Sequence, residues 1–251
     1  MIDIKEALLF ILYPRRCPIC HDIVTPRGHL ICPKCLQKVP FVQEPTCLCC
    51  GKEIASEEIE YCYDCSHHTR SFAGGFALAV YDPVMRESVR RFKNQGRMEY
   101  ADWYVEALWQ QYGEELRHLE IDAVVPVPLH HSRRNQRGYN QAELLARRLA
   151  KKLRVPILPK ALVRTRKTTA QKYLGGRERQ RNLESVFALG PRAKTGSGLP
   201  GGKSLVDGKT ILLVDDIYTT GGTAEACTRV LLDVGAKAVY LANICIGEND
   251  A

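Results

Sequence analysis

The sequence lacks any apolar run of about 18 residues, the length needed to cross a membrane. The one apolar stretch near its start, residues 7–13, is too short to span a bilayer and follows acids as well as a lysine, unlike a signal peptide. We therefore expect a cytoplasmic protein without membrane insertion. With 45% apolar residues, the chain can form a substantial core.

Acidic residues are scarce in one long stretch. Between Arg133 and Arg181 there are 16 lysines and arginines, against the two acids Glu143 and Glu178. This excess favours a polyanionic partner, either a small polyphosphate or a nucleic acid, and a basic helix face solvated by water is the alternative. Aromatic residues are also sparse there, so base stacking and sequence-specific DNA recognition have little support.

The cysteines follow a regular spacing, and nine of the eleven precede residue 66. Two thiolates separated by two residues can hold one metal ion through a tight turn, and two such pairs complete a tetrahedral Zn²⁺ site. The pattern predicts two structural zinc sites in a double zinc ribbon over residues 1–70. Its eight ligands are a set of four and its repeat thirty residues later: Cys17, Cys20, Cys32, Cys35, Cys47, Cys50, Cys62 and Cys65.

Four sulfur ligands leave no coordination position open, so these sites are expected to stabilise the fold and not to catalyse. The spacing alone does not say whether each site combines consecutive pairs or interleaved ones. A disulfide framework and iron–sulfur ligation are alternative uses of the same thiols. Cys49 is left over beside its pair, and Cys227 and Cys245 lie in apolar patterns typical of a core.

After residue 70, predicted strands alternate with predicted helices. Apolar runs predict strands in "FAGGFALAVYD", "IDAVVPVPL", "KTILLVDD" and "KAVYLANICI". Helical spacing marks residues 83–92, 99–116, 140–153 and 222–236, the last helix being closed by Gly235. This alternation predicts an α/β domain over residues 71–251, with a mostly parallel sheet, helices on both faces and ligands at the carboxyl ends of the strands.

A segment rich in glycine and proline, residues 190–203, predicts a mobile loop. Its end, "GKS", is similar to the end of a P-loop, but Ser197 occupies the position of the required first glycine. No predicted strand precedes the segment and no predicted helix follows it. We therefore exclude a P-loop nucleoside triphosphatase.

The most informative stretch is "ILLVDDIYTTGGTAEA", where two acids end a predicted strand and hydroxyl and glycine residues open a helix. Backbone N–H groups at a helix N-terminus favour an anion, and glycines let a phosphate approach closely. The neighbouring carboxylates would repel that phosphate unless ribose hydroxyls or Mg²⁺ lay between them. The alternative is an ordinary helix N-cap turn preceded by two exposed acids.

This stretch resembles the phosphoribosyl pyrophosphate (PRPP) motif of type I phosphoribosyltransferases. The resemblance implies the fold of those enzymes, Mg²⁺ as a cofactor, and Asp215 and Asp216 as catalytic acids that meet the ribose hydroxyls. It also implies that the 5′-phosphate is bound by the five residues Thr219, Thr220, Gly221, Gly222 and Thr223.

Further stretches extend the resemblance to nearly the whole chain. "VPVPLHHSRRNQRGYNQAELLA", "QKYLGGRERQRNLESVF" and the paired cysteines together resemble the ComF family, phosphoribosyltransferase-like proteins associated with DNA uptake in competent bacteria, which includes GntX-type proteins. The resemblance implies a pyrophosphate-binding loop after the strand that ends at Val127. Its candidate residues are Arg133, Arg134, Arg137 and Gly138, and arginine forks suit phosphate groups.

Other residues match the family motifs without revealing a role. Tyr139, Asn140 and Gln141 open the helix after the predicted pyrophosphate loop, and Gln171, Arg179 and Asn182 match a second basic segment. Lys93 and Arg97 in "RFKNQGR" are either phosphate ligands or solvated helix ends.

Two kinds of function follow from the resemblance. The first is a phosphoribosyltransferase, a glycosyl transfer enzyme with PRPP as donor and an unidentified acceptor, acting in DNA uptake, DNA utilisation or nucleoside metabolism. Departure of pyrophosphate from such a donor depends more on positioning and charge than on covalent chemistry. The second is a non-catalytic factor that binds PRPP and single-stranded DNA beside a competence helicase or other uptake proteins, or a PRPP-sensing regulator.

Overall fold

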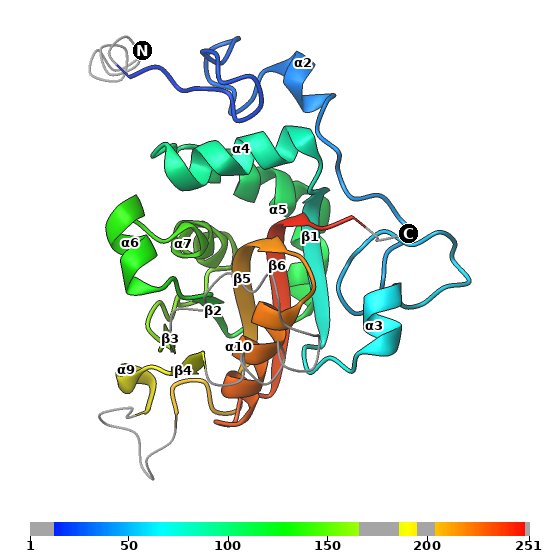
Figure 1. The fold of residues 1–251 in the computed structure, drawn as a ribbon, viewed down its shortest axis with the longest axis vertical. Coiled ribbons are helices and arrows are strands. Elements are labelled where there is room, and N and C mark those ends of the chain that lie inside the picture. The colour runs from blue at the N-terminus through cyan, green and yellow to red at the C-terminus, as the bar shows by residue number, and fades with distance from the viewer. Residues whose placement is uncertain (1–12, 166–185, 195–203, 249–251) are drawn as a thin grey trace, which may run out of the picture.

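The computed structural model describes residues 13–165, 186–194 and 204–248, which form a four-stranded parallel sheet with helices on both faces (Figure 1). The strand order is β1 (Gly74–Val80), β6 (Ala238–Ile246), β5 (Thr210–Tyr218) and β2 (Ala123–Pro126). Each neighbouring pair is parallel. The four strands and the parallel sheet predicted from the sequence are therefore confirmed.

Four long helices accompany the sheet, as predicted: α4 (Pro83–Asn94), α5 (Tyr100–His118), α7 (Gln141–Leu153) and α10 (Gly222–Leu232). In Figure 1, α5 and α7 lie behind the sheet, α10 lies in front, and α4 crosses above the carboxyl ends of the strands. Among the described residues, no helix is both long and apolar enough to cross a membrane.

Several short elements have no counterpart in the predictions. They are the helices α2 (Pro33–Leu36), α3 (Tyr63–His67), α6 (His131–Arg137) and α9 (Pro191–Lys194), and the antiparallel pair β3 (Leu162–Arg164) and β4 (Phe187–Leu189). The start of the predicted loop at residues 190–203 thus forms α9, and the rest of that loop lies outside the described residues. Elements this short carry too few periodic positions to be recognised from a sequence.

Local signals explain where the long helices begin. The carboxylate of Asp82 accepts a hydrogen bond from the Met85 N–H at 2.8 Å, and Pro83 fits the first helical turn because its missing N–H is not needed there. At the start of α7, the side chain of Asn140 accepts from the Ala142 N–H at 3.2 Å. The two helices on either side of the site are thus begun by capping residues.

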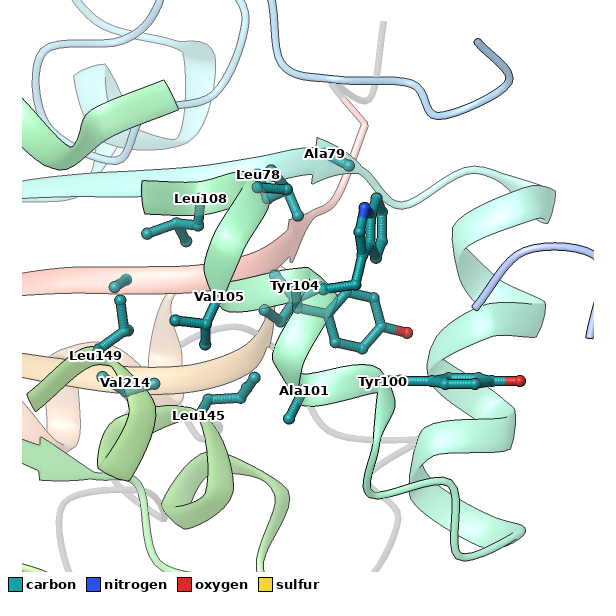
Figure 2. Close-up of a cluster of buried hydrophobic side chains, with 14 of the residues drawn as sticks. Leu78, Ala79, Tyr100, Ala101, Tyr104, Val105, Leu108, Leu145, Leu149 and Val214 are labelled. Carbon is teal, nitrogen blue, oxygen red and sulfur yellow. The ribbon is translucent and has the colours of Figure 1, made fainter. Parts of the chain in front are cut away.

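The sheet is buried on both faces, as parallel sheets generally are. Leu212 and Val214 of β5 face α5 and α7, whereas Ile211 and Leu213 face the α10 side. Figure 2 shows the first of these cores, where side chains gather between the sheet and two helices. They include Leu78, Tyr104, Val105, Leu108, Leu145, Leu149 and Val214.

The two cysteine-rich segments pack against different parts of this core. Cys17 and Cys35 belong to the α5 side, where His21 Nδ1 lies 2.6 Å from the hydroxyl of Tyr100. Cys47, Cys50 and Cys62 belong to the α10 side. The division of the chain at residue 70 stays a prediction, and both segments share apolar contacts with the residues beyond it.

The connection between the cysteine-rich segments protects an exposed sheet edge. Phe41 forms an antiparallel bridge with Ala79 of β1, and the Val42 N–H donates to the Leu78 carbonyl at 3.1 Å. β1 is the outer strand of the sheet, and an unpaired outer strand is prone to pair with other chains. The connecting segment therefore acts as an additional short strand.

We predict that Gly75→Ala destabilises the protein. A Cβ at Gly75 would lie 2.7 Å from the carbonyl oxygen of Cys50, so the second cysteine-rich segment would have to shift away from β1. We expect a loss of about 1–3 kcal/mol in the free energy of unfolding, typical of overpacking, measured by chemical denaturation. Gly247→Ala is the control, because its Cβ would meet atoms only at 3.7 Å or beyond. Equal stability of the two variants would contradict this close contact.

Candidate functional site

The five residues predicted to bind a phosphate line one small cavity. β5 ends at Tyr218 and α10 begins at Gly222, with Gly221 between them in the left-handed conformation at φ 76°. Residues 219–223 surround a cavity of about 100 Å³ together with Asp215 and Asn243. The backbone N–H groups at the start of an 11-residue helix are directed toward its N-terminal side, where an anion is favoured.

The two acids at the end of β5 occupy different environments, because successive strand residues point to opposite faces. The side chain of Asp216 is 13% exposed and forms an ion pair with Lys93, whose Nζ lies 2.7 Å from Oδ1. Asp215 lines the cavity beside the loop, and its Oδ1 accepts a hydrogen bond from the Asp216 N–H at 2.8 Å. Only one of the two carboxylates therefore has a close cationic partner among the described residues.

The surroundings of Asp215, which is half-buried, make it a weak acid. Desolvation, followed by the negative charge of Asp216, raises the pKa of Asp215 from 3.8 to about 7. The positive charges of Lys93 and Arg164 oppose this rise without cancelling it. The charged form of Asp215 is thus disfavoured until a ligand or cation supplies further compensation.

The predicted pyrophosphate residues lie on or beside α6, and their surroundings differ. Arg137 is half-buried and donates to Gln141 Oε1 at 3.2 Å. Burial lowers the pKa of Arg137, and the charge of Asp216 acts in the opposite direction. Arg133 and Arg134 are exposed, and a nitrogen of Arg134 lies 4.0 Å from Glu143. Gly138 ends α6 with φ 79°.

The residues of the family motif at the start of α7 join three elements around Lys93. The hydroxyl of Tyr139 donates to the Phe92 carbonyl, and Gln141 Nε2 donates to the Lys93 carbonyl at 3.3 Å. Asn140 Nδ2 donates to the Val127 carbonyl at 3.0 Å, just beyond β2. Tyr139 and Gln141 thus contact the end of α4 that carries Lys93, and Asn140 contacts the residue after β2.

Other predicted residues lie elsewhere. A nitrogen of Arg97 lies 3.7 Å from a carboxylate oxygen of Glu99. Desolvation, and then the positive charge of Arg97, lower the pKa of His21. Arg97 therefore lies on the side of the first cysteine cluster. Gln171, Arg179 and Asn182 lie outside the described residues.

Two site residues were missed by sequence reasoning. Arg164 of β3 is close enough to Asp215 for its charge to lower the pKa of that carboxyl. Asn243 of β6 pairs in register with Asp215, lines the cavity, and has a buried Nδ2 without a hydrogen-bond partner among the described residues. An asparagine inside the apolar run "YLANICI" was an available signal, since buried polar residues are usually satisfied by a partner.

The eight predicted metal ligands form two clusters of consecutive pairs, which settles the pairing. Cys17, Cys20, Cys32 and Cys35 form one cluster, and Cys47, Cys50, Cys62 and Cys65 form the other. Within each cluster, all ligand atoms lie within 4.8 Å of one another. The sulfurs of Cys50 and Cys62 are 3.6 Å apart, close to the separation of about 3.8 Å expected for tetrahedral ligands around Zn²⁺. Cys227 and Cys245 are buried core residues, as predicted.

Much of the positive charge on α7 is neutralised by neighbouring acids. Arg147 lies 2.6 Å from Glu143, Arg148 lies 2.6 Å from Asp102, and Lys152 lies 2.6 Å from Glu106. Asp102 and Glu106 belong to α5, so two of these pairs join the helices. The basic stretch thus contributes to helix packing. Its exposed arginines include Arg133 and Arg134 on α6 and Arg154 at the end of α7.

Sequence comparison assigns a class to each part of the chain. The profile of the double zinc ribbon domain matches residues 8–66, and that of the phosphoribosyl transferase domain matches residues 136–250. The molecule is therefore a protein of the type I phosphoribosyltransferase fold with an N-terminal double zinc ribbon, whose two four-cysteine clusters are structural zinc sites.

Relatives span both parts together. Competence protein F of Haemophilus influenzae is 26% identical over 90% of this chain and 94% of its own length. DNA utilization protein YhgH of Escherichia coli K12 is 29% identical over 91% and 83%, and competence protein ComFC of Bacillus subtilis is 26% identical over 83% and 80%. The chain belongs to the ComF family.

We predict that Asp215→Asn stabilises the unliganded protein more strongly at high pH. The pKa of Asp215 is about 7 in the folded protein, above its value of 3.8 in the unfolded chain. The stability that this carboxyl contributes is therefore fully present below pH 3.8 and is lost as the pH rises through about 7. An amide has no charge to desolvate, so the stabilisation at pH 8 should exceed that at pH 5 by about 2 kcal/mol in chemical denaturation. Asp233→Asn, at an exposed position, is the control. A gain independent of pH would refute the raised pKa of Asp215.

We predict two zinc ions per chain, measured by elemental analysis of the purified protein. Cys47→Ser should lose one of them, because it removes a ligand from the second cluster only. Cys49→Ser should keep both, because Cys49 belongs to neither cluster. Unchanged metal content in Cys47→Ser would exclude the assigned ligand set.

Proposed function

We propose that this protein binds PRPP with Mg²⁺ in a phosphoribosyltransferase-like site and acts in DNA uptake or DNA utilisation, in the cytoplasm. The observation that carries the proposal is the arrangement around one cavity, where the loop of residues 219–223 lies beside Asp215. Asp216, on the same strand as Asp215, forms an ion pair with Lys93 of α4. A ligand that needs both an anion site and acceptors for hydroxyl groups fits this arrangement.

A ribose 5-phosphate satisfies both requirements. Its phosphate would accept hydrogen bonds from the backbone N–H groups and threonine hydroxyls of the loop, and its ribose hydroxyls would donate to the carboxylates at the end of β5. The amide of Asn243 is a further donor, since its buried Nδ2 lacks a partner among the described residues. Such binding would satisfy polar groups that are costly to leave unpaired.

The residues of the site also fit Mg²⁺. Mg²⁺ prefers oxygen ligands and is commonly held by one or two carboxylates together with substrate phosphates. Asp215 and Asp216 offer those oxygens. Desolvation and the charge of Asp216 raise the pKa of Asp215, and a nearby cation would offset both effects. When bound, Mg²⁺ would neutralise charge on the pyrophosphate of the donor.

In a transfer reaction, the bond between C1 of the ribose and pyrophosphate breaks and a bond from C1 to the acceptor forms, while the acceptor loses a proton. Arg137, together with Lys93, would bind the departing pyrophosphate through its positive charge. The carboxylates would hold the ribose and stabilise the positive charge that develops near C1.

A role in DNA handling is suggested by the relatives, which are named for competence and DNA utilisation. The exposed side chains of Arg133 and Arg134 on α6 favour a second candidate, a non-catalytic factor that binds both PRPP and single-stranded DNA. In that case, the arginines would contact phosphates of the strand, and a competence helicase or other uptake proteins would be its partners.

We predict that wild-type protein binds PRPP in the presence of Mg²⁺ and that the double variant Asp215→Asn, Asp216→Asn binds it about 100-fold more weakly or worse. Two charge-assisted hydrogen bonds to the ribose are lost, each worth about 1.5–3 kcal/mol. Isothermal titration calorimetry measures the affinity, and Asp233→Asn should bind as the wild type does. Lack of PRPP binding by the wild-type protein would defeat the proposal.

Two further measurements separate the candidates. Release of pyrophosphate from PRPP with a panel of nucleobases, amines and single-stranded DNA tests transfer directly, and tight PRPP binding without any release favours the non-catalytic factor. Binding of single-stranded DNA should weaken with increasing salt and with Arg133→Ala, Arg134→Ala, because phosphate contacts release counterions. DNA affinity unaffected by salt would exclude contacts of this kind.

A further inference from the structure

The second cysteine cluster lies next to the phosphate loop, and Arg70 spans the distance between them. Arg70 follows the last ligand, Cys65, by five residues. Its Nη2 donates to the carbonyl oxygen of Thr220 at 2.8 Å, in the middle of the loop. The loop therefore receives a charge-assisted hydrogen bond from the end of the zinc ribbon.

The guanidinium of Arg70 is also surrounded by groups of the cluster side. Both its Cζ and the hydroxyl of Tyr218 lie beside Gly221 of the loop. The side chain of Tyr218 is buried in the apolar cluster that also contains Cys47, Cys50 and Cys62. A Zn²⁺ ion with four thiolates carries a net charge of about −2, which would attract the Arg70 side chain.

Gly221 shows how tightly these groups enclose the loop. A Cβ at this position would collide with the hydroxyl of Tyr218 and lie 3.2 Å from Cζ of Arg70. Gly221 is the residue before the first turn of α10, so Tyr218 and Arg70 limit where that helix can begin. The conformation of the loop at Gly221 thus depends on these two side chains.

A second attachment reinforces the first. The Ser71 N–H donates to Glu225 Oε2 at 2.8 Å, and its hydroxyl donates to Oε1 at 2.7 Å, so the residue after Arg70 is bound to α10. On the other side of the cluster, Gly51 and Gly75 meet by close backbone contact. The cluster is therefore held to β1 and to the start of α10 at the same time.

We infer that Arg70 is a positioning residue through which the second zinc cluster holds the phosphate loop in the shape that binds the 5′-phosphate of PRPP. The inference rests on the proposed function, since it assigns the ligand of that loop. It gives the second zinc ion a role that the first does not have, because Cys17 and Cys35 pack on the opposite side of the sheet.

Coupling between two sites is reciprocal: if the zinc cluster favours PRPP binding, then bound PRPP must stabilise the zinc cluster by the same factor. The test therefore measures both. PRPP affinity is determined by calorimetry for wild-type protein, Arg70→Ala, Arg70→Lys and the control Arg90→Ala, whose side chain is exposed and pairs with Glu87 on α4. Zinc release to a chromogenic chelator is then followed with and without PRPP.

We expect Arg70→Ala to bind PRPP about 10-fold to 100-fold more weakly, the effect of losing one charge-assisted hydrogen bond. Arg70→Lys should recover part of the affinity, and Arg90→Ala should match the wild type. In the wild type, PRPP should slow the release of one of the two zinc ions about 10-fold, and in Arg70→Ala this protection should disappear. Saturating Mg²⁺ is present throughout, and Arg70→Ala under identical conditions controls for zinc binding by PRPP itself.

The outcomes distinguish this inference from the proposed function. If the wild type binds PRPP but Arg70→Ala binds it equally well, or if PRPP protects neither zinc ion, the coupling through Arg70 is refuted while PRPP binding stands. If the wild type does not bind PRPP, the proposed function fails and the inference fails with it. If Arg70→Ala is unfolded by circular dichroism, Arg70→Lys decides: unchanged affinity and unchanged zinc protection would refute the role of the guanidinium fork.

Discussion

Parallel pairing of β5 between β2 and β6 is the constraint on which the site depends. Because all four strands run in the same direction, their carboxyl ends meet at one edge of the sheet. This edge brings together Asp215, the loop that follows Tyr218, and Asn243 of the neighbouring strand. A shift of β5 by one residue would exchange the faces of Asp215 and Asp216 and separate each from its present surroundings.

The electrostatics of this edge are unbalanced in the unliganded protein. Asp216 is buried and has Lys93 as a close partner, whereas Asp215 is half-buried and has a raised pKa. Such strain at a site is typical of places where a ligand supplies the missing charges or hydrogen bonds. An asparagine at position 215 would increase the free energy of unfolding. The folded protein is therefore less stable with an acid at this position, where the acid can bind the ligand.

The two zinc ribbons are both structural, and they pack against different elements of the α/β domain. The first packs against α5 through contacts such as His21 with Tyr100. The second packs against β1 and reaches the phosphate loop through Arg70. A zinc ribbon is too small to fold without its metal. Through such a contact, the geometry of a loop far away in the sequence can depend on whether the metal is bound.

The sequence by itself determined the features that depend on local periodicity and spacing: the four strands, the four long helices, the eight metal ligands and the stretch with Asp215 and the threonine and glycine loop. Only the tertiary structure decided which cysteines share a metal, that Lys93 pairs with Asp216, and that Arg70, Arg164 and Asn243 approach the site. Those contacts join residues far apart in the chain, and periodicity carries no information about which distant segments meet. Which distant segments meet is decided by the packing of helices on the two faces of the sheet, because this packing fixes the position of the end of each element.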